Sequence, residues 1–201
     1  MSTPPLPVAG TAVLLRPATP GFEVLLMRRP DRGSFASAWV FPGGKVEPAD
    51  RREGGGDLED ARRAAVRETF EEVGLVIDDL VALSEWQPPP EAPTRIRTWF
   101  FLATAPADDL ALAADEVSEV AWVSPAEALA RHAAGEWTLY PPTWLTLHQL
   151  AGFTDVASAL ASSGTAELFH TRIDEAETGR AFVWEQGRLE AESLPWRFIA
   201  T

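Results

Sequence analysis

Three glutamates stand close together in the segment RETFEEVGL, which begins at Arg67. Glu68, Glu71 and Glu72 are spaced i, i+3 and i+4, so on a helix they would share one face. Like charges so close repel, by roughly 4 kcal/mol for a pair 4 Å apart at an effective dielectric of about 20. A hard divalent cation removes that repulsion, and carboxylate oxygens suit Mg²⁺ or Mn²⁺ better than zinc. The segment therefore predicts a metal site that bridges to substrate phosphates, with a solvated helix face as the alternative.

The helix that carries these acids is predicted from both of its ends. Asp57 is a suitable N-cap, and Gly74 is placed to end the helix in a left-handed conformation. A core-facing stripe is predicted at i, i+4 and i+7 by Val66, Phe70 and Val73. The face with the acids continues in small side chains, which would leave space above it: Ala61, Ala64 and Ala65.

Apolar runs on both sides of this helix predict strands. Residues 7–16 and 23–29 read as a hairpin-like pair, and residues 39–46 as a short strand before a sharp turn. Further strands are expected at 80–86, 94–104 and 117–124, helices at 125–135, 141–153 and 155–164, and short strands in the tail. Strands, one central helix, more strands and then helices indicate an α+β protein or a three-layer sandwich.

The residues around the acids resemble a known motif. FPGGKVEPAD followed by RETFEEVGL is similar to the Nudix box of Nudix hydrolases, GX5EX7REUXEEXGU, in which U is a bulky apolar residue. Thr69 stands where a bulky apolar residue is usual, and a nine-residue insertion separates Gly44 from Glu59. Asp50 keeps the spacing from Gly44 and Glu59 keeps the spacing to Arg67, so the first acid of the box is either of these two. The remaining matches to the pattern are Arg67, Glu68, Glu71, Glu72, Gly74 and Leu75.

The resemblance implies an α/β/α sandwich with a mixed central sheet and additional C-terminal helices and strands. It also implies Mg²⁺- or Mn²⁺-dependent hydrolysis of a nucleoside diphosphate linked to another group. Glu71 and Glu72 would bind metal, Glu68 would bind metal or act as base, and the Gly44 carbonyl would add a ligand. Arg67 would orient a glutamate, and Glu116 would be an extra catalytic glutamate that acts as a base, with a surface acid as the alternative. We expect a Nudix domain at 1–152, with the box helix at 57–74, and a C-terminal extension at 153–201 packed on it.

The substrate is predicted less directly. The segments LLMRR and GSFASAWVFPGG, the box insertion and residues 122–151 resemble the branch that contains the animal peroxisomal coenzyme A diphosphatase, which implies coenzyme A or acyl-CoA. ADP-ribose, NADH or a dinucleoside polyphosphate is the alternative within the enzyme class, and a non-catalytic nucleotide-sensing module is the alternative outside it. Tryptophans and arginines near the box are candidates to stack on a base or meet phosphates, and the substrate-binding set is Arg29, Phe41, Arg95 and Arg97.

Composition narrows the class of protein. The formal net charge is −13, which disfavours binding to nucleic acid, and the chain has no cysteine for a disulfide or thiolate metal site. No apolar run reaches 18 residues, and the first residues lack the features of a secretory signal, so we expect a cytoplasmic protein without a membrane span. A homodimer is compatible with the resemblance, since many Nudix hydrolases pair.

Overall fold

The computed structural model describes residues 5–33, 35–176 and 179–201. Among them, eight strands form a mixed sheet with the order β3-β2-β1-β6-β5-β8, in which β4 also pairs with β1 and β7 with β2. The pairs β1–β6 and β5–β8 are parallel and the other pairs are antiparallel. The strands are β1 (Val8–Pro17), β2 (Phe22–Arg28), β3 (Trp39–Val40), β4 (Gly43–Lys45), β5 (Val81–Gln87), β6 (Arg97–Thr104), β7 (Glu119–Val123) and β8 (Glu167–His170).

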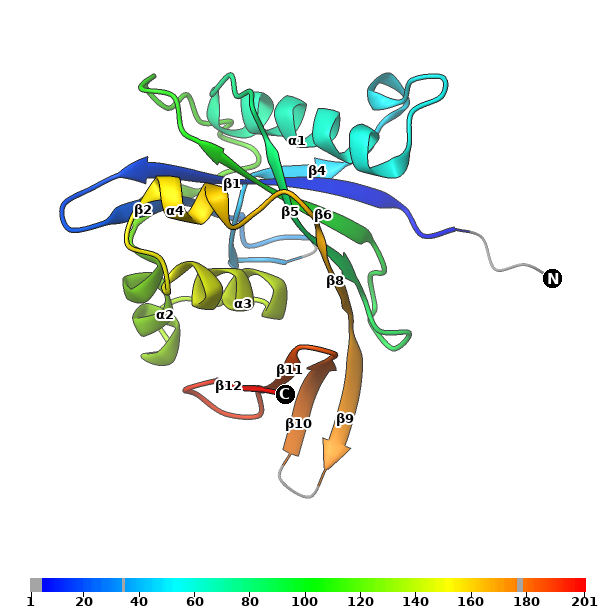
Figure 1. The fold of residues 1–201 in the computed structure, drawn as a ribbon, viewed down its shortest axis with the longest axis vertical. Helices are drawn as coiled ribbons and strands as arrows, with labels where there is room; N and C mark the ends of the chain where they lie inside the picture. The colour runs from blue at the N-terminus through cyan, green and yellow to red at the C-terminus, as the bar shows by residue number, and fades with distance from the viewer. Residues whose placement is uncertain (1–4, 34, 177–178) are drawn as a thin grey trace.

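Helices cover both faces of this sheet, as Figure 1 shows. Alternate residues of β1 point to opposite sides, because successive side chains of a strand do so. Ala12 and Leu14 pack in the cluster under α1, whereas Val13 and Leu15 pack in the cluster under the other helices. The helices are α1 (Asp57–Val73), α2 (Pro125–Ala133), α3 (Pro141–Leu150) and α4 (Val156–Ala161). The α+β class and the α/β/α layers predicted from the sequence are confirmed.

The C-terminal end of α1 matches the prediction from the sequence, whereas the N-terminal end does not. Gly74 ends the helix with φ 76°, as expected of a left-handed C-cap. The predicted N-cap at Asp57 is wrong, because Gly56 is the N-cap and Asp57 is the first helical residue. The Asp57 carboxylate instead pairs with Arg97 on β6.

The buried face of α1 also differs from the prediction. Phe70, expected in the core, is 57% exposed, and the alanines expected to line an open space are fully buried. The cause is the strand below, where a Cβ added to Gly10 of β1 would lie 1.8 Å from the carbonyl oxygen of Ala61. Helix and strand backbones therefore meet so closely that only small side chains fit between them.

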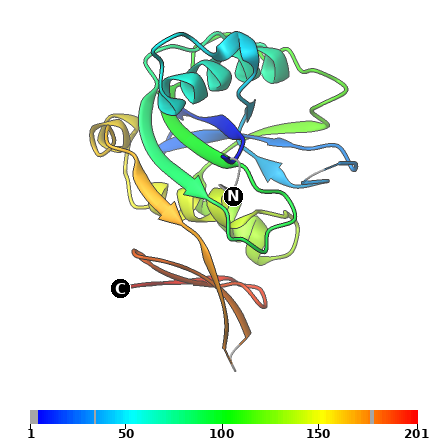
Figure 2. The same cartoon turned by 90° about the vertical axis from the view of Figure 1, so that its right-hand side faces the viewer.

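The tail forms a second sheet, with the order β12-β11-β10-β9. In Figures 1 and 2 it lies at the bottom, beyond the helices α2 and α3, and β8 leads into it from the edge of the main sheet. Trp184 and Leu189 from this sheet are buried in the same cluster as Trp86 and Phe169. Its strands are β9 (Arg172–Ala176), β10 (Gly179–Trp184), β11 (Gly187–Glu190) and β12 (Arg197–Ala200).

The segment 47–56, between β4 and α1, contains a short 3-10 helix at Pro48–Asp50. Within the residues that the structure describes, none of the helices combines the length and the apolar character needed to cross a bilayer.

Candidate active site

A group of carboxylates lies at the C-terminal half of α1. One oxygen from each of Glu68, Glu72 and Glu116 lies within 4.8 Å of the other two. Glu68 and Glu72 are one turn apart on the helix, whereas Glu116 comes from the loop before β7. That loop is fastened to the helix end, since Ala111 and Ala113 donate backbone hydrogen bonds to the carbonyl groups of Val73 and Glu72. Carbonyl groups in the last turn of a helix have no partner within the helix, and here they bind the loop that carries Glu116.

Glu72 is the most buried member of this group, with 1% of its surface exposed. Its carboxylate accepts a 2.8 Å hydrogen bond from the backbone N–H of Gly43 and a 2.9 Å bond from the guanidinium of Arg29. Burial and, to a smaller extent, the charges of Glu68 and Glu116 raise the pKa of Glu72 to about 8, against the lowering effects of these two donors. Burial therefore favours the neutral form of this carboxyl group unless a positive charge lies beside it.

Glu68 lies directly against the backbone of β4. A Cβ added to Gly44 would stand 2.2 Å from the Glu68 carboxyl group, so the glycine makes room for this acid. Burial raises the pKa of Glu68, the bond from Arg67 opposes that rise, and the nearby charges of Glu71 and Glu116 add to it. Gly44 is therefore needed for steric reasons, because a side chain at this position would displace the Glu68 carboxylate.

Arg67 connects several acids at the side of this group. It donates to both carboxylate oxygens of Asp50, at 3.2 and 2.9 Å, and to Glu68 and Glu71 at 2.9 and 2.8 Å. The bond to Asp50 is the main cause that raises the pKa of Arg67. Burial alone would raise the pKa of the Asp50 carboxyl, but the bonds from Arg67 and the Glu47 N–H outweigh it and lower that pKa.

The two candidates for the first acid of the box occupy different environments. Asp50 is buried and paired with Arg67, while Glu59 is on the surface and contacts Arg62 at 3.3 Å. Of the two candidates, Asp50 is the one that contacts Arg67. The residues between these two acids, 51–58, do not contribute to the group of carboxylates.

The structure gathers some of the predicted catalytic and metal-binding residues and sets one apart. Glu68, Glu72 and Gly44 come together, and Glu116, which is 44 positions beyond Glu72 in the sequence, joins them. Glu71, 51% exposed at its side chain, is bound to Arg67 and does not belong to the group of three. Its predicted role as a metal ligand stays a prediction.

The predicted substrate-binding residues are not in one place. Arg29 is engaged by Glu72, and Phe41 is buried with its ring edge-on to Phe100. The Nε of Arg95 is buried and, in the described part of the chain, has no hydrogen-bond partner. Of these four, only Arg29 contacts the carboxylate group, and Phe41 is not open to a base in this structure.

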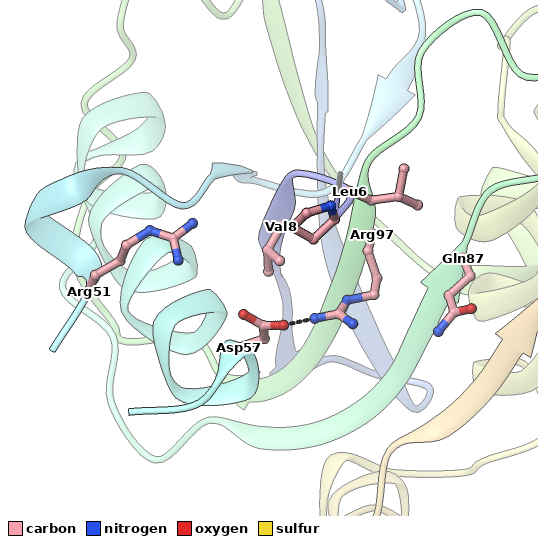
Figure 3. A pocket seen from close by; sticks show the side chains of 7 residues that line it. Leu6, Val8, Arg51, Asp57, Gln87 and Arg97 are labelled. Atoms are coloured by element: carbon pink, nitrogen blue, oxygen red, sulfur yellow. Dashed lines mark hydrogen bonds and ion pairs between the residues drawn. The ribbon is translucent and has the colours of Figure 1, made fainter. Parts of the chain in front are cut away.

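Arg97 lines a separate cavity of about 260 Å³, together with Arg51, Asp57 and Gln87. Figure 3 shows the Arg97 guanidinium turned toward the Asp57 carboxylate at the start of α1. Eleven residues separate Asp57 from Glu68, which corresponds to about 16 Å along a helix. Arg97 therefore belongs to the opposite end of the helix from the acids.

The donor set fits a hard divalent cation. Its three members are all carboxylates, and their closeness is costly without a positive charge between them. Because Glu72 is buried, water cannot solvate its negative charge. A cation or a bound proton must therefore neutralise it. These residues therefore suit Mg²⁺ or Mn²⁺ in type and arrangement.

Comparisons with known proteins agree with the geometry. The family model described as the NUDIX domain matches residues 5–142. A Caenorhabditis elegans protein, "Putative nudix hydrolase 7", is 28% identical over 174 residues, which cover 66% of this chain and 57% of that protein. The chain thus matches little more than half the length of this relative.

Solved structures share the fold. The NUDIX hydrolase from Alicyclobacillus acidocaldarius superposes with a TM-score of 0.71, at 22% identity, over 83% of this chain and 99% of that one. The NUDIX domain of Shewanella oneidensis NrtR, complexed with ADP ribose, gives 0.57 at 17% identity, over 73% and 87%. At such identities the likeness concerns the fold alone. Since the family model covers more than half of the chain, the protein belongs to the NUDIX domain family.

Proposed function

We propose that this chain is a metal-dependent diphosphatase that hydrolyses a nucleoside diphosphate linked to another group. The observation that carries the proposal is the group formed by Glu68, Glu72 and Glu116 at the end of the box helix. These acids, with the Gly44 carbonyl by family analogy, hold Mg²⁺ or Mn²⁺. When bound, such an ion polarises a phosphoryl oxygen and lowers the pKa of a bound water.

The residues around the ion have distinct roles in this proposal. Glu72, fixed by Gly43 and Arg29, is the rigid ligand, because both of its oxygens already accept a bond from the protein. Arg67 positions Glu68 by a charge-assisted hydrogen bond and is itself fixed by Asp50. Glu116 is the exposed member of the three and takes the proton of the attacking water, because an exposed carboxylate can pass that proton on to solvent.

Coenzyme A or acyl-CoA is the substrate that we propose first, on the basis of the sequence resemblance. Water would add to one phosphorus of the diphosphate, the bridging P–O bond would break, and 4′-phosphopantetheine and adenosine 3′,5′-bisphosphate would leave. ADP-ribose is the second candidate, because the NrtR domain with the same fold was solved with that ligand. A nucleotide-sensing module without turnover is the alternative from another class.

The experiment that tests this proposal is product analysis by mass after incubation of the protein and Mg²⁺ with coenzyme A, ADP-ribose and NADH in parallel. We expect diphosphate cleavage that stops when a chelator removes the metal. Glu72→Gln should lower kcat by about 10³-fold, since the loss of a metal ligand removes several kcal/mol of charge stabilisation. The fold should persist, because the amide still accepts from Gly43.

The matched control is Glu59→Gln, an exposed glutamate on the same helix. Its kcat should equal that of the unmodified protein. Turnover by Glu72→Gln equal to that of this control would remove the carboxylate group from the reaction. Tight binding of one nucleotide with no product from any of the three compounds would favour the sensing module.

A further inference from the structure

Two aromatic rings are exposed in contact with each other, on segments far apart in the chain. Phe35 is 42% exposed and Tyr140 is 39% exposed, and their ring centroids lie 4.8 Å apart in an edge-to-face arrangement at 89°. Phe35 follows β2 and Tyr140 precedes α3. Large aromatic rings are normally buried, so a pair held in contact at the surface suggests a binding role.

The backbone that presents Phe35 is strained. Phe35 and Ser37 have φ values of 63° and 58°, in the left-handed region that side chains other than glycine rarely adopt. Ser37 is fixed by hydrogen bonds to Asp31 and to the carbonyl of Pro30. Such conformations persist where the surrounding structure enforces them, and they are concentrated at functional sites.

The segment that carries Phe35 is joined by a backbone hydrogen bond to Arg29, the residue that follows β2. The N–H of Arg29 donates to the carbonyl of Ala38, and the N–H of Trp39 donates to the carbonyl of Thr138, both at 2.9 Å. Two strand spacings of about 4.8 Å therefore separate Arg29 from the segment that ends at Tyr140, or about 10 Å. Arg29 in turn contacts Glu72.

A cavity of about 230 Å³ is lined in part by the segments that carry the two rings. Its lining includes Ser37 and Thr138, each two residues from one of the rings, and Arg28. Leu139 is buried, so Thr138 and Tyr140 face the other side of their extended segment. The two rings are not among the residues that line the cavity, but they come from the same two segments as Ser37 and Thr138.

A further contact connects this surface to the third acid. Arg32, in the same turn as Phe35, donates to the carbonyl of Asp115, the residue before Glu116. β2 and β7 pair in antiparallel fashion, with Arg28 at the end of β2 opposite Glu119 at the start of β7, so the loop after β2 and the loop before β7 lie at the same edge of the sheet. The rings are therefore fixed with respect to the carboxylates through two independent connections.

We infer that Phe35 and Tyr140 form a stacking platform for the nucleobase of the substrate, an inference that rests on the proposed function. A diphosphate held at Glu68, Glu72 and Glu116 places its ribose over Arg29 and its base at the rings. Base–aromatic stacking tolerates different bases, because every base has a π face. The platform therefore selects for a planar nucleobase without reading its edge.

The test compares the binding of AMP and ribose 5-phosphate, which differ by the base, in ligand-detected NMR without metal. Phe35→Leu and Tyr140→Leu should each weaken AMP binding by about 10-fold, the loss expected for one stacking contact, and leave ribose 5-phosphate unchanged. Phe35→Tyr and Tyr140→Phe keep the rings and should retain AMP binding. In turnover of the best diphosphate substrate, the leucine variants should raise KM and leave kcat within about twofold.

The matched control is Phe70→Leu, which removes another exposed ring. Phe70 is two positions from both Glu68 and Glu72, and this places it about 200° around the helix from them. AMP binding equal to that of the unmodified protein in both leucine variants would overturn the inference, as would an unmodified protein that binds AMP no better than ribose 5-phosphate. If the leucine variants weakened the binding of 4′-phosphopantetheine and not that of AMP, the rings would contact the other half of coenzyme A. This result would also overturn the inference.

These outcomes are separable from failure of the proposed function. A protein without diphosphatase activity whose AMP binding depends on both rings retains the platform and loses the enzymatic proposal. A diphosphatase that depends on Glu72 and whose KM is unchanged in both leucine variants keeps the activity and loses the platform.

Discussion

At the scale of single residues, the pair of Asp50 and Arg67 decides how the box is built. Asp50→Asn removes the charge that holds Arg67 while it keeps the size of the side chain. We expect the free energy of unfolding to fall by about 2 kcal/mol, less than the loss for a fully buried pair because Arg67 is partly exposed. Turnover should fall as well, since Arg67 also positions Glu68. Urea denaturation and steady-state kinetics measure the two effects.

Glu59 provides the control for this prediction. Its side chain is on the surface and pairs only with Arg62 among the contacts that the structure describes. Glu59→Gln should therefore change stability by less than about 0.5 kcal/mol. If Glu59→Gln costs more than Asp50→Asn, Glu59 and not Asp50 is the first acid of the box.

The sequence predicted the residues of the carboxylate group better than their arrangement. The i, i+4 spacing was sufficient to bring Glu68 and Glu72 together, because helical geometry is local. The same spacing argument predicted that Glu71 would also belong to the group, but its carboxylate is bound to Arg67 at the side of the group. Glu116 was a candidate only through family resemblance, since the loop contacts that bring it to Glu72 are not visible in a linear pattern.

At the scale of elements, the approach of α1 to β1 sets where the acids stand. Gly10→Ala would place a methyl group 1.8 Å from the Ala61 carbonyl, and the backbone on both sides cannot yield. We expect a loss of about 3 kcal/mol in unfolding free energy, as in other overpacked cores, and a large fall in activity because the helix moves from β4. Denaturant titration measures the first effect and initial rates the second.

Gly56→Ala is the comparison, since nothing lies within 4 Å of the added methyl group. It alters only the N-cap and should cost less than about 1 kcal/mol. Equal losses in the two variants would mean that glycine matters at position 10 for its flexibility and not for the close approach.

This close approach also explains which elements were predictable. The hairpin of β1 and β2 and the end of α1 at Gly74 follow from local signals, namely turn residues and a left-handed C-cap. The buried face of α1 does not, because hydrophobicity pointed to Phe70 whereas the partner strand leaves room only for Ala61, Ala64 and Ala65. Steric fit between two elements is a property of the pair, and neither segment carries it alone.

At the scale of the whole molecule, the second sheet is joined to the main one through aromatic packing. Trp86 of β5 stacks on Phe169 of β8 with centroids 4.1 Å apart, and Trp184 of β10 meets Trp86 edge-on at 5.7 Å. The Trp184 indole donates to the buried Thr171 hydroxyl at 2.9 Å. A side chain from the tail is thus part of the core beneath the central sheet.

We therefore predict that the chain unfolds as one cooperative unit. Trp184→Ala should reduce the unfolding free energy by about 3–5 kcal/mol and shift the transition of the entire protein, because the cavity opens next to Trp86 and Phe169. Leu194→Ala, at an exposed position of the same region, should have little effect. Tryptophan fluorescence and far-UV circular dichroism should give coincident urea transitions in each variant. An early transition confined to part of the signal would instead make residues 153–201 a separate folding unit, and the carboxylates of α1 would then remain in place when the tail unfolds.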